Sequence, residues 1–176
     1  MLRVSTGLRT GVFALAIAGG AAVLGAHAQG LINNPRISAA LANQLVGDTV
    51  AACAAKGYNV VAVVVNLDGV RQALLRGDGA PIHSMDNAYY KAYSAASLTL
   101  GRNEGSTKEV AQRMAKNPPS TVPQTPLPNV TYAVGGVTIK AGGKAIGAIG
   151  VSGAPGGQFD EECALTALAK IQDQLK

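Results

Sequence analysis

Two hairpin patterns constrain the fold of this chain more than any other feature of its sequence. Residues 59–66 (NVVAVVVN) are too few and too rich in β-branched side chains for a helix, and they are typical of a buried strand. The Asp-Gly pair at 68–69 favours a tight turn, after which residues 70–76 return as a second strand. A second hairpin is predicted from residues 137–140 and 145–151, which flank an Ala-Gly-Gly-Lys turn. Because hairpins rather than strand–helix–strand units join these strands, we predict an antiparallel sheet.

Helical patterns surround the two hairpins. Pro35 is expected in the first turn of the first helix, Ser84 is expected to cap the second, and Ser106-x-x-Glu109 is a capping box for a short third helix. The four predicted helices cover residues 35–57, 84–99, 106–116 and 160–175.

A proline-rich segment separates the third helix from the second hairpin. Residues 117–129 hold five prolines without apolar periodicity, so we expect an extended loop there. Residues 131–134 are expected to add another strand. The sequence therefore predicts an α/β fold of the α+β type, with an antiparallel sheet of about five strands and helices packed on it.

The first 28 residues resemble a cleavable secretory signal. Arg3 and Arg9 make this end positive, residues 11–25 are apolar, and Ala26-His27-Ala28 supplies the small residues of a cleavage site. A helix that spans a bilayer needs about 20 apolar residues, so this stretch is too short, although an uncleaved anchor is the alternative. We expect residues 1–28 to be removed and residues 29–176 to form one domain, periplasmic or secreted, with no membrane span after processing.

The charge of the remaining chain argues against nucleic acid as a partner. The leader carries two arginines and no acid, so its removal lowers the formal charge from +5 to +3. No run of lysines and arginines remains, and the chain has five tyrosines but no tryptophan on which bases could stack.

The two cysteines, Cys53 and Cys163, leave two interpretations open. In an oxidising compartment they could form a disulfide that closes a loop of about 110 residues. Both lie in alanine-rich helical stretches, however, where a buried free thiol acts as a small apolar side chain, and this second interpretation is the one we favour from the sequence. Their separation does not match a metal site.

The candidate ligand residues lie between positions 83 and 93. His83 is the one histidine of the chain after processing, which excludes a histidine cluster within one subunit; it could bind a metal, donate a proton or be a solvated loop residue. Tyr89 and Tyr93 share one face of the predicted helix, where they could ligate a metal, line a flat ligand or simply pack. Lys91 lies between them as a possible partner for an anion or as a surface charge.

Two catalytic patterns are excluded by their details. Residues 150–157 (GVSGAPGG) contain neither G-x-x-x-x-G-K-[ST] nor G-x-G-x-x-G, and acidic residues follow them, so a tight connection is the better interpretation than a phosphate loop. No G-x-S-x-G nucleophile elbow is present.

Three stretches resemble the GlcG/HbpS family of haem-binding and haem-degrading proteins, which is similar to the C-terminal domain of PduO proteins. They are residues 52–69 (ACAAKGYNVVAVVVNLDG), 74–97 (LLRGDGAPIHSMDNAYYKAYSAAS) and 135–168, which contains GAIGVSGA followed by D-E-x-C-A. The resemblance implies a profilin-like α/β domain and homo-oligomers. Thr138 and Asn66 depart from the proline and aspartate that are common in the family.

The resemblance also implies a function, an exported protein that binds haem and possibly degrades it or senses haem and redox state. We expect a pocket lined by residues 77–93, with His83, Tyr89 or Tyr93 as the iron ligand and Lys91 paired with a haem propionate. Whether the chain is an enzyme stays open.

Two alternatives to haem binding remain. The absence of a convincing catalytic constellation favours a non-catalytic accessory or sensor module, which binds a protein partner such as a periplasmic sensor or dehydrogenase, or a small organic acid. A small-molecule enzyme that uses the glycine-rich loop is the less supported alternative.

Overall fold

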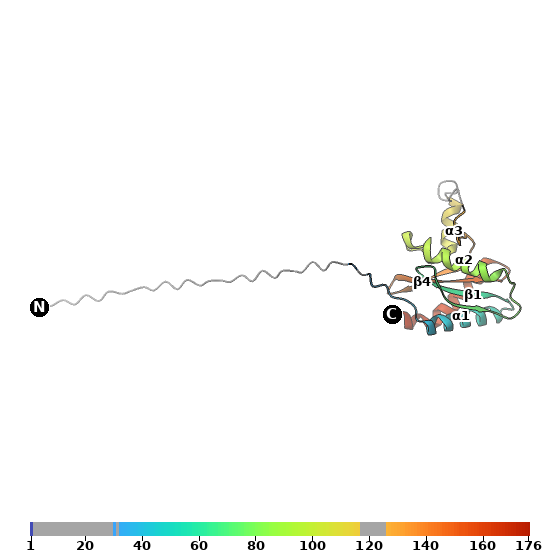
Figure 1. Ribbon diagram of the computed structural model, residues 1–176, viewed down its shortest axis with the longest axis horizontal. Coiled ribbons are helices and arrows are strands. Elements are labelled where there is room, and N and C mark those ends of the chain that lie inside the picture. The colour runs from blue at the N-terminus through green and yellow to red at the C-terminus, as the bar shows by residue number, and fades with distance from the viewer. Residues whose placement is uncertain (2–29, 31, 117–125) are drawn as a thin grey trace. The chain divides into compact units, whose positions relative to one another are not determined.

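The computed structural model describes residues 1, 30, 32–116 and 126–176. Its folded unit extends from Asn33 to Lys176 (Figure 1). The predicted leader, apart from Met1, lies outside the described residues, as do residues 117–125 of the predicted proline-rich loop. None of the helices in the described part of the chain is long and apolar enough to cross a bilayer.

The folded unit is built on a four-stranded antiparallel sheet with the strand order β2-β1-β4-β3. The strands are β1 (Val61–Asn66), β2 (Arg71–Arg76), β3 (Gly136–Ala141) and β4 (Lys144–Ser152). Both predicted hairpins are confirmed, and β1 and β4 pair with each other at the centre of the sheet. The described residues 130–134 form no strand, so the sheet has four strands where we expected about five.

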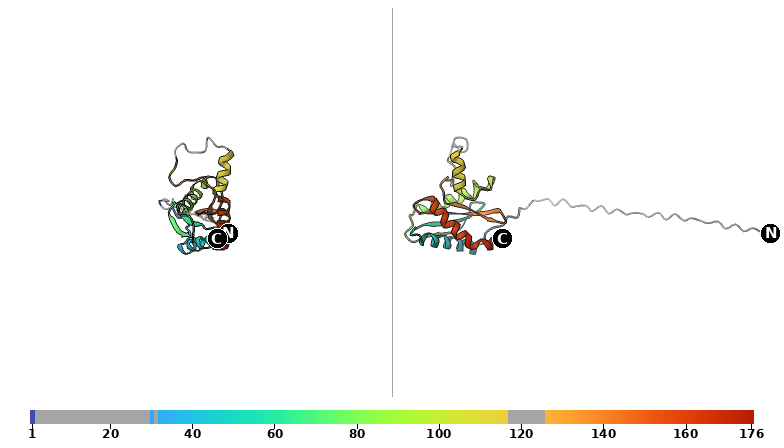
Figure 2. Two further views of the ribbon diagram at one scale, coloured as in Figure 1. Left: turned by 90° about the vertical axis from the view of Figure 1, so that its right-hand side faces the viewer. Right: turned by 180° about the vertical axis from the view of Figure 1, so that it is seen from behind.

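Helices cover both faces of the sheet (Figures 1 and 2). On one face α1 (Ala39–Ala54) and α5 (Gly157–Ile171) lie side by side, and on the other face α2 (Ser84–Ser97) lies across β4 and β1. The shorter α3 (Thr107–Lys116) contacts α2 and β3. This α+β architecture is the predicted fold class.

The two helical layers explain the uninterrupted apolar run of β1. Successive side chains of a strand point to opposite faces. Val60, Ala62 and Val64 accordingly pack with α1 and α5, whereas Val61, Val63 and Val65 pack with α2. A strand that is covered on both faces cannot alternate between apolar and polar residues, which is why every residue of β1 is buried.

The α2 backbone lies unusually close to the sheet because two glycines face it. A Cβ atom at Gly150 would overlap the Ala88 carbonyl oxygen, and one at Gly136 would overlap the Lys91 carbonyl oxygen. Small residues on α2, such as Ala92, complete this contact. The alanine-rich character of α2 and the glycines of β3 and β4 are therefore two sides of one packing requirement.

Several predicted helix ends differ from those observed. α1 begins at Ala39 rather than near Pro35, because the Ser38 side chain accepts a hydrogen bond from the Leu41 N–H and caps the helix there. Ser84 is the first residue of α2 and not its cap, which is His83. α5 begins at Gly157, three residues before the predicted start.

A further 3₁₀ turn, η2 (Gln172–Leu175), follows α5. Another, η1 (Leu100–Arg102), leads from α2 towards α3.

Cys53 and Cys163 form a disulfide, which overturns the interpretation of two buried free thiols. Cys53 lies in α1 and Cys163 in α5, 110 residues apart in the sequence, with their Cα atoms 5.4 Å apart. The pairing follows from the side-by-side packing of the two helices, which the sequence did not reveal. Both residues are fully buried.

We expect loss of the disulfide to lower stability without changing the fold. In a Cys53→Ala/Cys163→Ala variant the free energy of unfolding should fall by about 2–5 kcal/mol, because the unfolded chain regains the freedom of a long closed loop. Urea denaturation of the variant and of the wild type measures the difference. Reductant should destabilise the wild type and leave the variant unchanged; an equal response of both would contradict a stabilising disulfide.

Candidate functional site

His83 lies at the surface, at the point where the loop of residues 77–83 enters α2. It caps α2 through its backbone only, and its side chain makes no capping hydrogen bond. The apolar residues on either side are unusually exposed: Ile82 is 78% exposed and Met85 is 36% exposed. An accessible imidazole is thus surrounded by apolar surface.

The edge strand β2 extends this surface with a row of alternating side chains. Arg71, Leu74 and Arg76 pair with Val65, Val63 and Val61 of β1, whose side chains pack with α2. Residues opposite each other on paired strands share a face, so the row points to the α2 side of the sheet. α2 itself lies over β1, β4 and β3, which leaves this side of β2 largely uncovered and Leu74 exposed.

Both arginines of this row are held in place. The Arg71 guanidinium lies 3.5 Å from the centroid of the Tyr89 ring, a cation–π contact. The Arg76 Nε donates a hydrogen bond to the Ala80 carbonyl oxygen at 2.9 Å, which ties β2 to the loop that carries His83. Neither arginine has an ion-pair partner among the described residues. The sequence gave no signal for them, because each is an isolated arginine in a strand.

Tyr89 and Tyr93 lie together as predicted, with ring centroids 6.0 Å apart. Tyr89 is buried, and its hydroxyl donates to the Gly69 carbonyl oxygen at 3.1 Å. Tyr93 is half-buried and lines a small cavity of about 70 Å³ next to the β1–β2 turn.

His83 and Tyr93 lie near opposite ends of α2. Ten residues separate them, and at about 1.5 Å per residue this amounts to roughly 15 Å along the helix. His83 and Tyr93 are therefore alternative ligands for one iron, not joint ones.

Lys91 lies away from this surface, in a buried ion pair. Its Nζ is 2.7 Å from the Asp160 carboxylate, and the two side chains are 5% and 3% exposed. The interpretation of Lys91 as a surface charge is wrong, and its ammonium already has a partner at the start of α5. The Asp160 carboxylate also accepts a hydrogen bond from the Ala154 N–H at 3.0 Å. No sequence signal linked Lys91 and Asp160, which are 69 positions apart.

The pKa of Asp160 reflects two opposing influences. Burial raises the pKa of its carboxyl above the ordinary value, because the charged form loses hydration. The Lys91 ammonium and the Ala154 N–H act in the opposite direction by stabilising the carboxylate. Burial is the larger influence.

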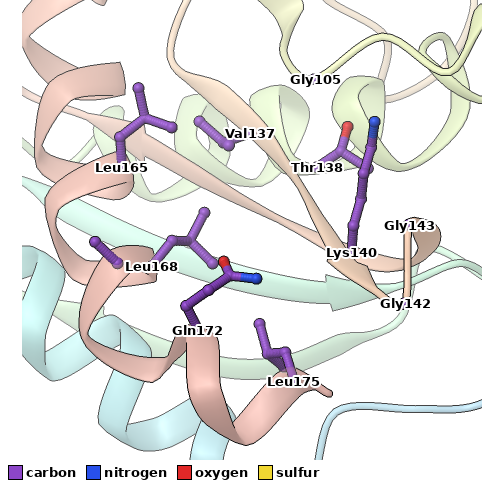
Figure 3. A pocket seen from close by; sticks show the side chains of 11 residues that line it. Gly105, Val137, Thr138, Lys140, Gly142, Gly143, Leu165, Leu168, Gln172 and Leu175 are labelled. Atoms are coloured by element: carbon purple, nitrogen blue, oxygen red, sulfur yellow. The ribbon is translucent and has the colours of Figure 1, made fainter.

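A groove of about 490 Å³ lies at the opposite edge of the sheet, between β3 and the end of α5 (Figure 3). We call it the β3–α5 groove. Its lining is mainly apolar or glycine, and its members include Gly105, Val137, Thr138, Lys140, Gly142, Gly143, Leu165, Leu168, Gln172 and Leu175. No predicted site residue lies in it. The sequence did not reveal the groove, because its walls come from segments that are far apart in the chain.

The described residues contain no group of three or more histidine, cysteine and acidic side chains that could hold a metal ion by themselves. Among the predicted ligands, His83 is thus the most accessible. The arrangement of an open imidazole, exposed apolar side chains and two arginines is suited to a flat, apolar molecule with anionic groups.

Comparisons with known proteins identify close structural counterparts. A family model described as "Haem degrading protein HbpS-like" matches residues 37–169. The crystal structure of HbpS is 31% identical, with a TM-score of 0.71 over 81% of this chain and 94% of that chain. A double mutant of Streptomyces reticuli HbpS is 28% identical, with a TM-score of 0.70 over 92% of this chain and 99% of that chain.

A more distant structure, the complex of PduOC with haem, shares the fold at 23% identity and a TM-score of 0.66, over 77% of this chain and 94% of that chain. No curated protein sequence matches the chain.

The ion pair predicts a specific pattern of stability. Asp160→Asn keeps the shape of the side chain but leaves the Lys91 ammonium buried without a counter-charge, which should lower the free energy of unfolding by about 3–5 kcal/mol. The double variant Lys91→Met/Asp160→Asn should recover part of this loss. Lys170→Met, which breaks the exposed pair with Asp48, is the control and should cost less than about 1 kcal/mol. Equal losses in the single and double variants, measured by urea denaturation, would contradict this account of the pair.

The same pair predicts a pH dependence. Since the pKa of Asp160 is raised on folding, the folded chain holds a proton that the unfolded chain has already released, and the free energy of unfolding falls as the pH rises towards the raised pKa. In Lys91→Met the opposing effect of the ammonium is lost, so the pKa of Asp160 should rise further and the decline should extend to higher pH. Urea denaturation over a series of pH values tests this; identical profiles for the two proteins would refute it.

Proposed function

This chain belongs to the HbpS-like family of haem-degrading proteins, and on that premise we propose that it binds haem on the surface around His83. We call this the His83 surface and define it by Leu74, Ile82, His83 and Met85, with Arg71 and Arg76 beside them. The observation that carries the proposal is an accessible imidazole flanked by two strongly exposed apolar side chains. Exposed apolar surface of this kind is typical of a binding site.

Each part of the His83 surface suits one part of haem. The imidazole can coordinate the iron through a ring nitrogen, since the side chain forms no capping hydrogen bond. Leu74, Ile82 and Met85 offer apolar contact to the macrocycle. Arg71 and Arg76 carry positive charge on the same side of β2, where they can pair with propionates. The residues therefore fit the group.

Tyr89 is better suited to support this surface than to ligate iron. Its hydroxyl is engaged with the Gly69 carbonyl oxygen, and its ring lies under the Arg71 guanidinium. It thereby orients Arg71, which makes it a positioning residue. Tyr93 stays the alternative iron ligand, since it is half-buried beside a small cavity.

Haem breakdown is the second part of the proposal. Bound haem would supply an iron able to activate an oxidant, and the protein would contribute the axial ligand and the contacts that orient the ring. Because the His83 surface is open, the side of the ring away from the imidazole would be accessible to an oxidant and a reductant, or would be covered by a second copy of the chain in a homo-oligomer.

We also propose that the chain acts outside the cytoplasm. The N-terminal 28 residues have the pattern of a cleavable signal, and the fully buried disulfide between α1 and α5 is of the kind that forms in oxidising compartments.

A haem titration followed by ultraviolet-visible spectroscopy tests the proposal. The wild type should show a saturable shift of the Soret band near one haem per chain. His83→Ala should weaken haem binding by roughly tenfold or more, because the axial bond is lost. Since His83 is exposed, the variant should unfold at the same urea concentration as the wild type.

Tyr93→Phe is the matched variant, because it removes only the alternative ligand atom. We expect it to bind haem as the wild type does. An unchanged Soret band in His83→Ala together with a lost one in Tyr93→Phe would transfer the iron to Tyr93. No saturable shift in the wild type would remove haem binding and favour the accessory or sensor module that binds a protein partner.

A further inference from the structure

The β3–α5 groove has the composition of a site for an amphipathic anion. Its floor consists of the buried side chains Val137, Leu168 and Leu175, and Leu165 forms part of its wall although it is 49% exposed (Figure 3). Its volume of about 490 Å³ lies within the range of roughly 300–1,000 Å³ that is usual for small-molecule sites.

Charge selects among the possible occupants. Lys140 is the one charged side chain among the described residues that line the groove, and none of them is acidic. Its Nζ donates to the Asn103 carbonyl oxygen at 2.9 Å, a neutral partner that orients the ammonium without neutralising it. A carboxylate bound there would form a charge-assisted hydrogen bond and would supply the missing counter-charge.

The leucines select the rest of the molecule. On α5 and the following turn, Leu165, Leu168 and Leu175 line the groove, and Val137 contributes from β3. Saturated chains gain from contact with such surfaces in proportion to the apolar area that is removed from water. A small hydrophilic acid would leave these side chains exposed.

We propose that the β3–α5 groove binds an aliphatic monocarboxylate, with the carboxylate at Lys140 and the chain along Leu165, Leu168 and Leu175. The site is separate from the His83 surface, which lies beyond the other edge of the sheet, at β2. It therefore does not depend on the proposed haem binding.

Decanoate is the probe, used below the concentration at which it forms micelles and followed by isothermal titration calorimetry. The wild type should bind decanoate saturably, and it should bind decanol, which lacks the charge, roughly tenfold more weakly. Lys140→Met should bind decanoate no better than decanol. Lys144→Met is the matched control, because Lys144 is an exposed lysine of the same hairpin that does not line the groove, and it should bind like the wild type.

A second variant tests the apolar wall. Leu165→Asp should abolish decanoate binding, since it places a negative charge beside the chain at a position exposed enough to leave folding intact. Absence of saturable binding in the wild type, or equal effects of Lys140→Met and Lys144→Met, would overturn the proposal. If Leu165→Asp instead changes the sedimentation coefficient while the wild type binds no decanoate, the groove is an interface between copies of the chain.

Haem distinguishes this proposal from the proposed function. His83→Ala should bind decanoate like the wild type, and haem at a saturating concentration should not displace decanoate. Displacement would overturn the inference of a separate site and assign the groove to haem. Haem binding without decanoate binding would reject only the groove, and decanoate binding without a Soret shift would reject only the haem proposal.

Discussion

The backbone of α2 can lie directly against the sheet because Gly136 and Gly150 carry no side chain. This close approach has consequences throughout the molecule. It brings the Lys91 ammonium down to the Asp160 carboxylate, so that the pair links α2 to the first turn of α5. It also confines α2 to β4, β1 and β3, and the outer side of β2 is left open. Larger residues at either glycine would lift the helix and disturb both arrangements.

The two faces of the sheet are stabilised by different interactions. On the α1 and α5 face, an extended apolar core is reinforced by the disulfide between Cys53 and Cys163. On the α2 face the apolar cluster is smaller, and a buried ion pair and backbone contacts contribute beside it. The candidate ligand surface and the β3–α5 groove lie towards opposite edges of the sheet. A rigid two-layered core therefore supports two edges that are free to carry binding functions.

The candidate site could be located from the sequence only in part. His83, Tyr89 and Tyr93 were singled out by residue type and local spacing, and the structure places the two tyrosines together and the histidine at the accessible end of the helix. Lys91 was assigned to the same site, because its neighbours in the sequence are Tyr89 and Tyr93, yet its partner is Asp160. Arg71 and Arg76 escaped notice because only the pairing of β2 with β1 places them beside α2.

The sequence by itself determined the local structure and the fold class. The valine-rich strand, the two hairpin turns and the helical periodicities depend on interactions between residues close in the chain, and these were predictable. Tertiary structure alone decided the disulfide, the buried ion pair, the number of strands and the β3–α5 groove. Each of these depends on which distant segments come into contact: 110 positions separate the two cysteines and 69 separate Lys91 from Asp160. Such contacts follow from how the helices pack on the sheet, and no local pattern of residues records that packing.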